Sequence, residues 1–343
     1  MRFSGPCLIP ELLNVPEVLA TLQPWAHHPL ALLALFLAAS ALMIWRLNAM
    51  ENKGLEGTVI GTLIMPYCSG AANLAFAWIM SRSAASAATN GGLVVQNAIV
   101  NNVTNLTLVL GLAALLWPAV RKKAAKKASG AMRIERLNLL FTLIALFLFT
   151  GTLWALGKDG TIDFHDALVL VGLFVFWQIL HVFEILKNNI RRNTDIHWSI
   201  IIDLLLLAAT VWATYYSIDQ LVNWVETAQS DYFTPARLGW LSGLLMVLPN
   251  ALLAVYYARI GRQDIVVSSQ VGDGHICIPM GIGLFALFIP IVPSAQFQLG
   301  MQIILGAAAL NFLCIAVLGR VPRFMGGILI GIYAAFIFMG GFQ

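Results

Sequence analysis

Ten apolar stretches, most of them about 20 residues long, set the first constraint on what this chain can fold into. A helix needs about 20 apolar residues to cross a bilayer, so each stretch predicts one membrane span. The connections are too short for a sizeable soluble domain, and 59% of the 343 residues are hydrophobic while 10% are charged. The predicted spans are residues 29–47, 55–80, 92–117, 137–156, 164–186, 198–218, 239–258, 265–289, 297–318 and 324–339. The sequence therefore predicts an all-α polytopic membrane protein and argues against a soluble enzyme.

The basic residues fall mostly on one side of these predicted spans. Sixteen of the 20 Lys and Arg residues lie in or beside the loops that follow the odd-numbered spans, and the other four are Arg2, Arg82, Lys158 and Arg237. Basic loop residues favour the cytoplasmic side, so we expect both chain termini outside the cell. The expected location is the inner (plasma) membrane of a bacterial cell, with the lipid bilayer as a partner. Basic residues beside membrane spans also argue against nucleic-acid binding.

The two halves of the chain repeat each other. Residues 93–102 align without gaps with residues 265–274, and the same offset carries Gly111 onto Gly283. Each aligned stretch follows a predicted span with a central proline, Pro66 in the first half and Pro249 in the second. Five spans per half is an odd number, so the second half enters the membrane in the opposite sense. The sequence thus predicts a short external segment, residues 1–28, and a 5+5 inverted-topology repeat of residues 29–190 and 191–343, which is typical of transporters.

Polar side chains form one helical stripe in each half. At four-residue spacing, each stripe shares one helical face: Asn97, Asn101 and Asn105 in the first half, and Ser269, Asp273 and Cys277 in the second. Buried amides often join helices by hydrogen bonds, which is the alternative interpretation of the asparagines. A carboxylate such as Asp273 costs about 2.5–3.5 kcal/mol at the centre of a span and commonly marks an ion path. We therefore expect Asp273 to take part in ion transport.

The matching prolines and the neighbours of Asp273 support further interpretations. A proline within a span frees a backbone carbonyl, so Pro66 and Pro249 predict broken helices beside an ion site, although a plain kink explains either one alone. His275 and Cys277 are candidate ligands of a soft metal ion. Their two-residue spacing puts them on different helical faces, and buried cysteines are commonly apolar fillers. The sequence holds no nucleophile–base pair and no closed metal motif, so we expect neither an enzyme nor a cofactor.

The two stripes resemble the alpha repeats of the cation/calcium exchanger superfamily, which contains the sodium/calcium exchangers and their prokaryotic relatives. Residues 96–105 are similar to the family pattern Gly-Asn-x-x-Gly-Ser-Asn-x-x-Asn at three asparagines, and residues 264–273 are similar to Asp-x-x-Val-[Gly/Ser]-[Asn/Ser]-x-x-Gly-Ser. The resemblance implies a sodium/calcium exchanger-like fold of about ten helices, with alpha repeats near residues 55–117 and 239–290. It also implies alternating access by sliding of the first and sixth spans over the repeat core.

The sequence departs from that family directly after the two prolines. The resemblance implies an acidic residue at each place, where this chain has Tyr67 and Asn250. A calcium ion beside Asp273 alone would keep one uncompensated positive charge in a low-dielectric site. Sodium, a proton and calcium are all candidate substrates, and a single carboxylate favours a monovalent cation or a proton.

Two hypotheses from different classes follow. In the first, the chain is a secondary active cation antiporter of the sodium/calcium exchanger type with altered ion specificity, and Asp273 is the charged ligand or proton carrier. Tyr67 lines or gates the site. Neutral oxygens come from Asn97, Asn101, Asn102, Asn250 and Ser269. In the second hypothesis the chain is a transport-inactive structural or regulatory membrane subunit, because both family carboxylates are missing. The sequence identifies no protein partner.

Overall fold

The computed structural model describes residues 28–51, 65–82, 87–116, 129–190, 199–227, 231–260, 263–294 and 296–341. In this part of the chain the ten predicted spans are helical. In chain order they are α2 (Pro29–Glu51), α4 (Met65–Arg82), α5 (Ala87–Val103) with η2 (Thr104–Val109) and α6 (Leu110–Leu116), α7 (Ser129–Leu156), α8 (Phe164–Ile190), α9 (Ile200–Thr227), α10 (Leu238–Ile260), α11 (Gln263–Ile276) with η5 (Cys277–Ile282) and α12 (Gly283–Ala286), α13 (Gln296–Leu318) and α14 (Arg323–Phe336). The predicted all-α plan is confirmed, and α7 begins at Ser129, ahead of the apolar span Leu139–Asp159.

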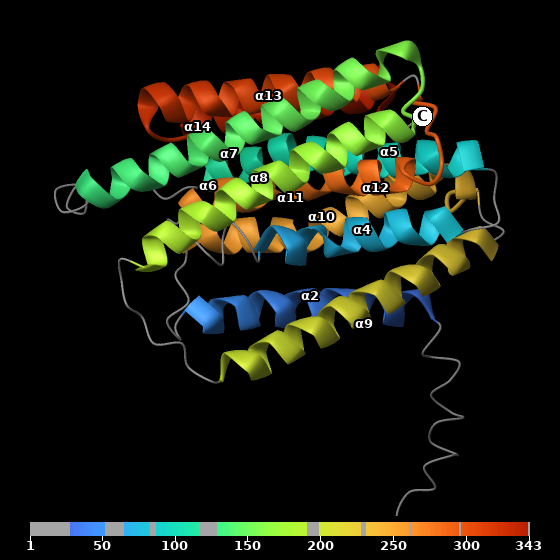
Figure 1. Ribbon diagram of the computed structural model, residues 1–343, viewed down its shortest axis with the longest axis horizontal. Coiled ribbons are helices and arrows are strands. Elements are labelled where there is room, and N and C mark those ends of the chain that lie inside the picture. The colour runs from blue at the N-terminus through green and yellow to red at the C-terminus, as the bar shows by residue number, and fades with distance from the viewer. Residues whose placement is uncertain are drawn as a thin grey trace, which may run out of the picture.

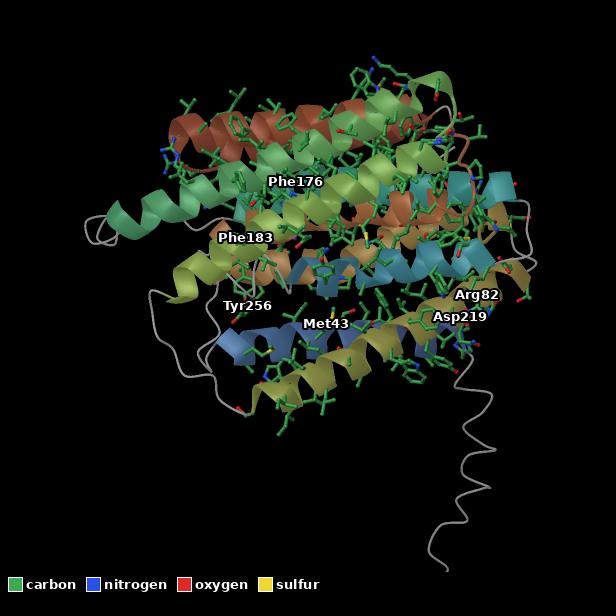
Figure 2. All side chains as sticks on the ribbon, in the orientation of Figure 1. Met43, Arg82, Phe176, Phe183, Asp219 and Tyr256 are labelled. Carbon is green, nitrogen blue, oxygen red and sulfur yellow. The ribbon has the colours of Figure 1, made fainter. Side chains whose placement is uncertain are left out.

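Length and composition identify these helices as membrane spans. Among the described residues, seven helical stretches are long and apolar enough to cross a bilayer. Large apolar side chains such as Leu205, Trp212 and Val317 are exposed, where a soluble protein would carry charged groups. Figure 2 shows Arg82 and Asp219 close to one end of the helix bundle. The chain is therefore an integral membrane protein.

The helices of the two halves pack in matching pairs. α5 lies against α10 as α11 lies against α4, and α14 packs on α6 and η2 as α8 packs on α12 and η5. Glycines permit the closest approaches, because a Cβ on Gly111 would lie 2.9 Å from the carbonyl oxygen of Gly326, and a Cβ on Gly283 would lie 3.0 Å from the side chain of Val171. The two aligned glycines thus take the same place in their repeats. The structure confirms the inverted-topology repeat.

The first and sixth spans form a layer of their own. α2 and α9 lie side by side at one edge of the molecule, next to α4 and α10 (Figure 1). Arg46 Nη1 lies 3.2 Å from Asp203 Oδ1, and the aspartate side chain is fully buried. The hydroxyls of Ser40 and Thr210 donate to carbonyl oxygens of their own helices. The ion pair therefore joins α2 to α9 rather than to the repeat core.

Local hydrogen bonds define the helix ends between the fourth and fifth spans. Asp163 Oδ1 accepts the backbone N–H groups of His165 at 2.8 Å and Asp166 at 3.1 Å, and Asp166 Oδ2 accepts the N–H of Asp163. This reciprocal cap starts α8. The hydrogen bond from the backbone N–H of Asp166 lowers the pKa of Asp163 most. The contacts with His165 lower this pKa further, so it lies below its usual value. Gly160 (φ 90°) and Gly319 (φ 67°) follow the fourth and ninth spans in matching turns.

Candidate ion-binding site

Asp273 lies at the centre of the repeat core and binds asparagines from both halves of the chain. Its side chain, on α11, is fully buried. Asn250 of α10 donates through Nδ2 to Asp273 Oδ2 at 2.6 Å, and Asn105 of η2 donates to the same oxygen at 2.9 Å. Hydrogen bonds to an ionised acceptor are the strong ones, and two of them meet on a single oxygen here.

The hydrogen bonds continue from Asn105 across the first half. Asn105 Nδ2 also donates to Asn101 Oδ1 at 2.9 Å, and Asn101 Nδ2 donates to Asn73 Oδ1 at 3.3 Å. Asn73 belongs to α4 and Asn101 to α5, and all three amides are buried. A connected line of polar side chains thus joins α4, α5, η2, α11 and α10, and Asp273 is its only carboxylate.

Gln270 and Ser269 form the other edge of this cluster. Gln270 Nε2 donates to the backbone oxygen of Asn250 at 3.2 Å and to Ser269 Oγ at 3.0 Å. Ser269 in turn donates to the carbonyl of Val266 in its own helix. These bonds hold α11 against α10 on the side where Asn250 meets Asp273.

The helix backbone is irregular at matching places in the two halves. Both α5 and α11 change to a π-helix, η2 at Thr104 and η5 at Cys277, and such wider turns often occur at functional sites. In η5 the cause is Pro279, which lacks an N–H group. In η2 the hydroxyls of Thr104 and Thr107 bind the carbonyl oxygens four residues earlier and compete with the backbone ladder. Asn105 lies within this widened turn.

The two sequence-predicted prolines differ in their settings. Pro249 lies inside α10, directly before Asn250, and α10 continues through it as one helix from Leu238 to Ile260, so the predicted break is not seen there. Pro66 is the second residue of α4, where a missing N–H has no intrahelical partner to lose. Residues 52–64, which precede α4, lie outside the described part of the chain, so the break at Pro66 stays a prediction.

Several buried amide oxygens around Asp273 have spare acceptor capacity. Within the described residues, Asn102 Oδ1, Asn105 Oδ1 and Gln270 Oε1 accept no hydrogen bond. A carboxylate can only accept, so the amides beside Asp273 must turn their nitrogen to it and their oxygen away. Buried oxygens without donors are costly to keep, and a cation supplies the missing partner. The cluster is therefore rich in potential cation ligands.

Three sequence-predicted residues lie at the margin of the cluster or outside it. Asn97 Nδ2 donates to Ser242 Oγ of α10 at 2.9 Å and is one helical turn away from Asn101. Asn102 Nδ2 binds a carbonyl of its own helix. The Tyr67 side chain is 40% exposed, and its ring lies 6.2 Å from that of Phe174 in α8. Tyr67 lines a cavity of about 500 Å³ with Gln178 and Met280, and its role as a gate stays a prediction.

The two candidate metal ligands point in different directions. His275 Nε2 lies 2.8 Å from the backbone oxygen of Thr142 in α7, and its ring packs edge to face against Phe149. Cys277 is buried at the start of η5. In the described part of the chain, groups of three or more His, Cys, Asp and Glu side chains that could hold a metal ion are not found.

Charge is scarce in the buried part of the protein. Among the described residues, Asp203 and Asp273 are the fully buried carboxylates, and Asp203 is paired with Arg46 in the α2–α9 layer. The repeat core therefore offers one carboxylate surrounded by amides. A ten-span inverted repeat that encloses such a cluster has the architecture of a secondary membrane transporter.

The chain belongs to the sodium/calcium exchanger protein family, whose model matches residues 29–183 and 198–340. This membership confirms the resemblance seen in the two polar stripes. Transported cations are the substrates of this family, whose exchangers take no cofactor and are not enzymes.

Known proteins are similar to this one over almost the whole chain. Uncharacterized membrane protein MJ0091 of Methanocaldococcus jannaschii is 21% identical over 309 residues, which cover 89% of this chain and 93% of the relative. Two structures of the sodium-calcium exchanger NCX_Mj are similar to the present one. The first, soaked with 2.5 mM Na⁺ and 10 mM Sr²⁺, has a TM-score of 0.63 and 21% identity and covers 90% of this chain and 95% of its own. The second, soaked with 100 mM Na⁺ and 10 mM Sr²⁺, has a TM-score of 0.65 and 19% identity. It covers 89% of this chain and 95% of its own.

Proposed function

We propose that the protein is a secondary active antiporter with altered ion specificity, which exchanges a monovalent cation or a proton at Asp273. The observation that carries this proposal is the bond from Asn250 Nδ2 to Asp273 Oδ2, at the place where the family resemblance implies a second carboxylate. An amide there leaves the repeat core with a single negative charge. One charge among neutral oxygens balances one monovalent cation.

The proposed ligands are Asp273 and the amide oxygens around it. Asn101, Asn102, Asn105 and Asn250 come from α5, η2 and α10 and are all buried. An Asn side chain changes from donor to ligand by a half turn of its amide group, which brings the oxygen to the place of the nitrogen. Asn97 and Ser269 complete the proposed wall on either side.

Calcium is a poor fit for this donor set. Calcium sites ordinarily use several carboxylate oxygens, and the second charge of the ion would face only amides here. A divalent ion that keeps one excess charge in a low-dielectric site is strongly disfavoured. Sodium, potassium and protons are the substrates that match one carboxylate.

The membrane orientation belongs to the same proposal. Both termini lie outside the cell, in the inner (plasma) membrane of a bacterium, because the basic residues collect in the loops on the other side. Residues 29–190 and 191–343 are the two five-helix repeats, and 1–28 is an external segment. Accessibility labelling of single cysteines introduced at Asp159 and Arg259, in intact and in opened cells, tests this orientation. External labelling at Arg259 would contradict it.

Thermal stability of the purified protein, measured across a series of cations, tests the proposed function. A ligand that binds only the folded state adds about 2.7 kcal/mol when its concentration is 100 times its Kd. We expect stabilisation by one monovalent cation or a pH-dependent shift, and its loss in Asp273→Asn. Asp159→Asn, an exposed loop carboxylate, is the matched control and keeps the response. Flux in proteoliposomes then measures exchange of that ion.

A second candidate function is a transport-inactive membrane subunit. The observation that favours it is the pair of amide bonds to Asp273 Oδ2, which satisfies this oxygen with protein groups alone. Equal stability in all cations and at all pH values, together with no cation flux above that of protein-free vesicles in either the wild type or Asp273→Asn, would replace the antiporter by this function.

A further inference from the structure

The two amide donors to Asp273 come from opposite halves of an inverted repeat. Asn250 stands on α10 of the second half, 2.6 Å from Asp273 Oδ2, and Asn105 stands on η2 of the first half, 2.9 Å from the same atom. The three side chains are at most 4% exposed. The buried carboxylate thus receives one strong hydrogen bond from within its own repeat and one across the interface between the repeats.

The amide bonds to Asp273 affect whether the ion site can close without a bound cation. In an exchanger whose site holds several carboxylates, like charges repel each other in the closed site unless a cation neutralises them. A closed site without a cation is then too costly, and the carrier must return with a counter-ion. Asn250 removes this repulsion, because its amide donates to Asp273 where a carboxylate would oppose it.

We propose that Asn105 and Asn250 can close the site around Asp273 in place of a cation, so that the carrier also returns across the membrane without a counter-ion. The protein then has a second activity, cation uptake that runs down the electrochemical gradient and needs no exchange partner. One positive charge crosses the membrane per cycle. The inference rests on the proposed transport function and adds a mode that strict exchange forbids.

Asn105 is the less obvious member of this pair. Its Nδ2 binds both Asp273 Oδ2 and Asn101 Oδ1, so the closed arrangement extends through Asn101 to Asn73 on α4. Its Oδ1 has no hydrogen-bond partner among the described residues and is free to ligate a cation after the amide turns. We therefore assign Asn105 a positioning role in the closed site and a ligand role when the cation is bound.

Full-length protein in proteoliposomes tests the second activity. Vesicles are loaded either with sodium or with the impermeant cation N-methylglucamine, and uptake of radioactive sodium and of radioactive rubidium is measured from outside. We expect uptake in both kinds of vesicle, with the N-methylglucamine vesicles responding to an inside-negative membrane potential. A pH-sensitive dye inside the vesicles reports proton exit.

The variants compare uptake without a counter-ion with exchange in the same preparation. Asn250→Asp, assayed at a pH alkaline enough to leave the pair without its shared proton, places a like charge beside Asp273, and Asn105→Leu removes the other donor. Each is expected to lower the ratio of uptake to exchange about tenfold or more, because a hydrogen bond to a charged group is lost. Asn311→Leu is the matched control, since this buried amide binds only a carbonyl of α13 in the described contacts, and it keeps the wild-type ratio.

Three results would overturn the inference. Wild-type uptake that requires sodium or rubidium inside the vesicles shows strict exchange. Proton exit equal to cation entry shows that the carrier returns with Asp273 protonated rather than with its amides in place. Ratios unchanged in both Asn250→Asp and Asn105→Leu, in variants that remain folded and still exchange, remove the role of the amides. If exchange persists in any of these cases, the proposed antiporter function is still supported. Absence of all flux in the wild type contradicts both the antiporter function and uptake without a counter-ion.

Discussion

A second carboxylate at Asn250 should give this protein a calcium site. Asn250→Asp keeps the size of the side chain and changes the Nδ2 donor, 2.6 Å from Asp273 Oδ2, into an acceptor with a negative charge. Two carboxylate charges about 4 Å apart repel each other by about 4 kcal/mol at an effective dielectric constant of about 20. The pair therefore holds a proton until a cation replaces it.

A divalent cation removes this repulsion and neutralises both groups. The binding free energy of calcium should therefore become more favourable by about 4 kcal/mol, which corresponds to about a thousandfold higher calcium affinity. Binding must displace the shared proton, so the apparent calcium affinity of the variant should rise about tenfold per pH unit while the pair is protonated. Stability of the wild-type protein should depend little on calcium.

Thermal unfolding against calcium concentration at several pH values measures this effect. Asn250→Leu controls for loss of the amide without added charge, and the double variant Asn250→Asp/Asp273→Asn controls for the partner carboxylate. Both should lack calcium-dependent stabilisation. The reasoning is refuted if Asn250→Asp gains no calcium response, or if the double variant responds as strongly as the single one.

Three further predictions concern parts of the fold around the site. Arg46→Ala and Asp203→Ala should each lower the free energy of unfolding in detergent by about 3–5 kcal/mol, while the double apolar variant Arg46→Met/Asp203→Leu recovers most of it, and a double-mutant cycle that shows additive effects would contradict the buried pair. Gly274→Ala should cost about 1–3 kcal/mol, because its Cβ would lie 2.5 Å and 2.7 Å from two side chains of the first half, whereas Gly306→Ala, with open space, should be neutral by the same measurement. Asp163→Asn should lower the unfolding temperature at neutral pH, and because the folded-state pKa of Asp163 is depressed, that difference should shrink as the pH falls below 3.8.

The polar centre could be predicted from the sequence, because the residues of the four-residue stripes do lie together in the folded protein. Spacing by four residues predicts that Asn101 and Asn105 share a face, and both lie in the line of hydrogen bonds that reaches Asp273. The aligned pair Gly111 and Gly283 predicted the repeat and marks equivalent helix contacts. Local periodicity and composition are sufficient for these features, since each depends on one helix at a time.

Which helix faces which partner could not be read from that periodicity. Asn97 lies on the same helical face as Asn101, one turn before it. It nevertheless binds Ser242 of α10, because α5 and α10 are in close contact at that turn. Asn73 and Gln270 lie outside the four-residue stripes, so spacing along one helix does not indicate their partners. Their partners are set by helix crossings that only the folded structure defines.

The two amide donors of Asp273 belong to different halves of the chain, Asn250 to the same half as Asp273 and Asn105 to the other half. Where alternating access moves the two halves against each other largely as rigid bodies, contacts within one half persist and contacts between halves are remade. Asn250 and Asp273 stand on adjacent helices of the second half, and their bond should survive both conformations. Asn105 reaches Asp273 across the interface, so its bond should form in the closed state and release when either side opens. On this argument Asn105→Leu removes both a cation ligand and the contact that closes the site, so it should alter ion affinity and also the balance between open and closed states. Changes at Asn250 should alter the affinity alone, and an unchanged balance between open and closed states in Asn105→Leu would contradict the argument.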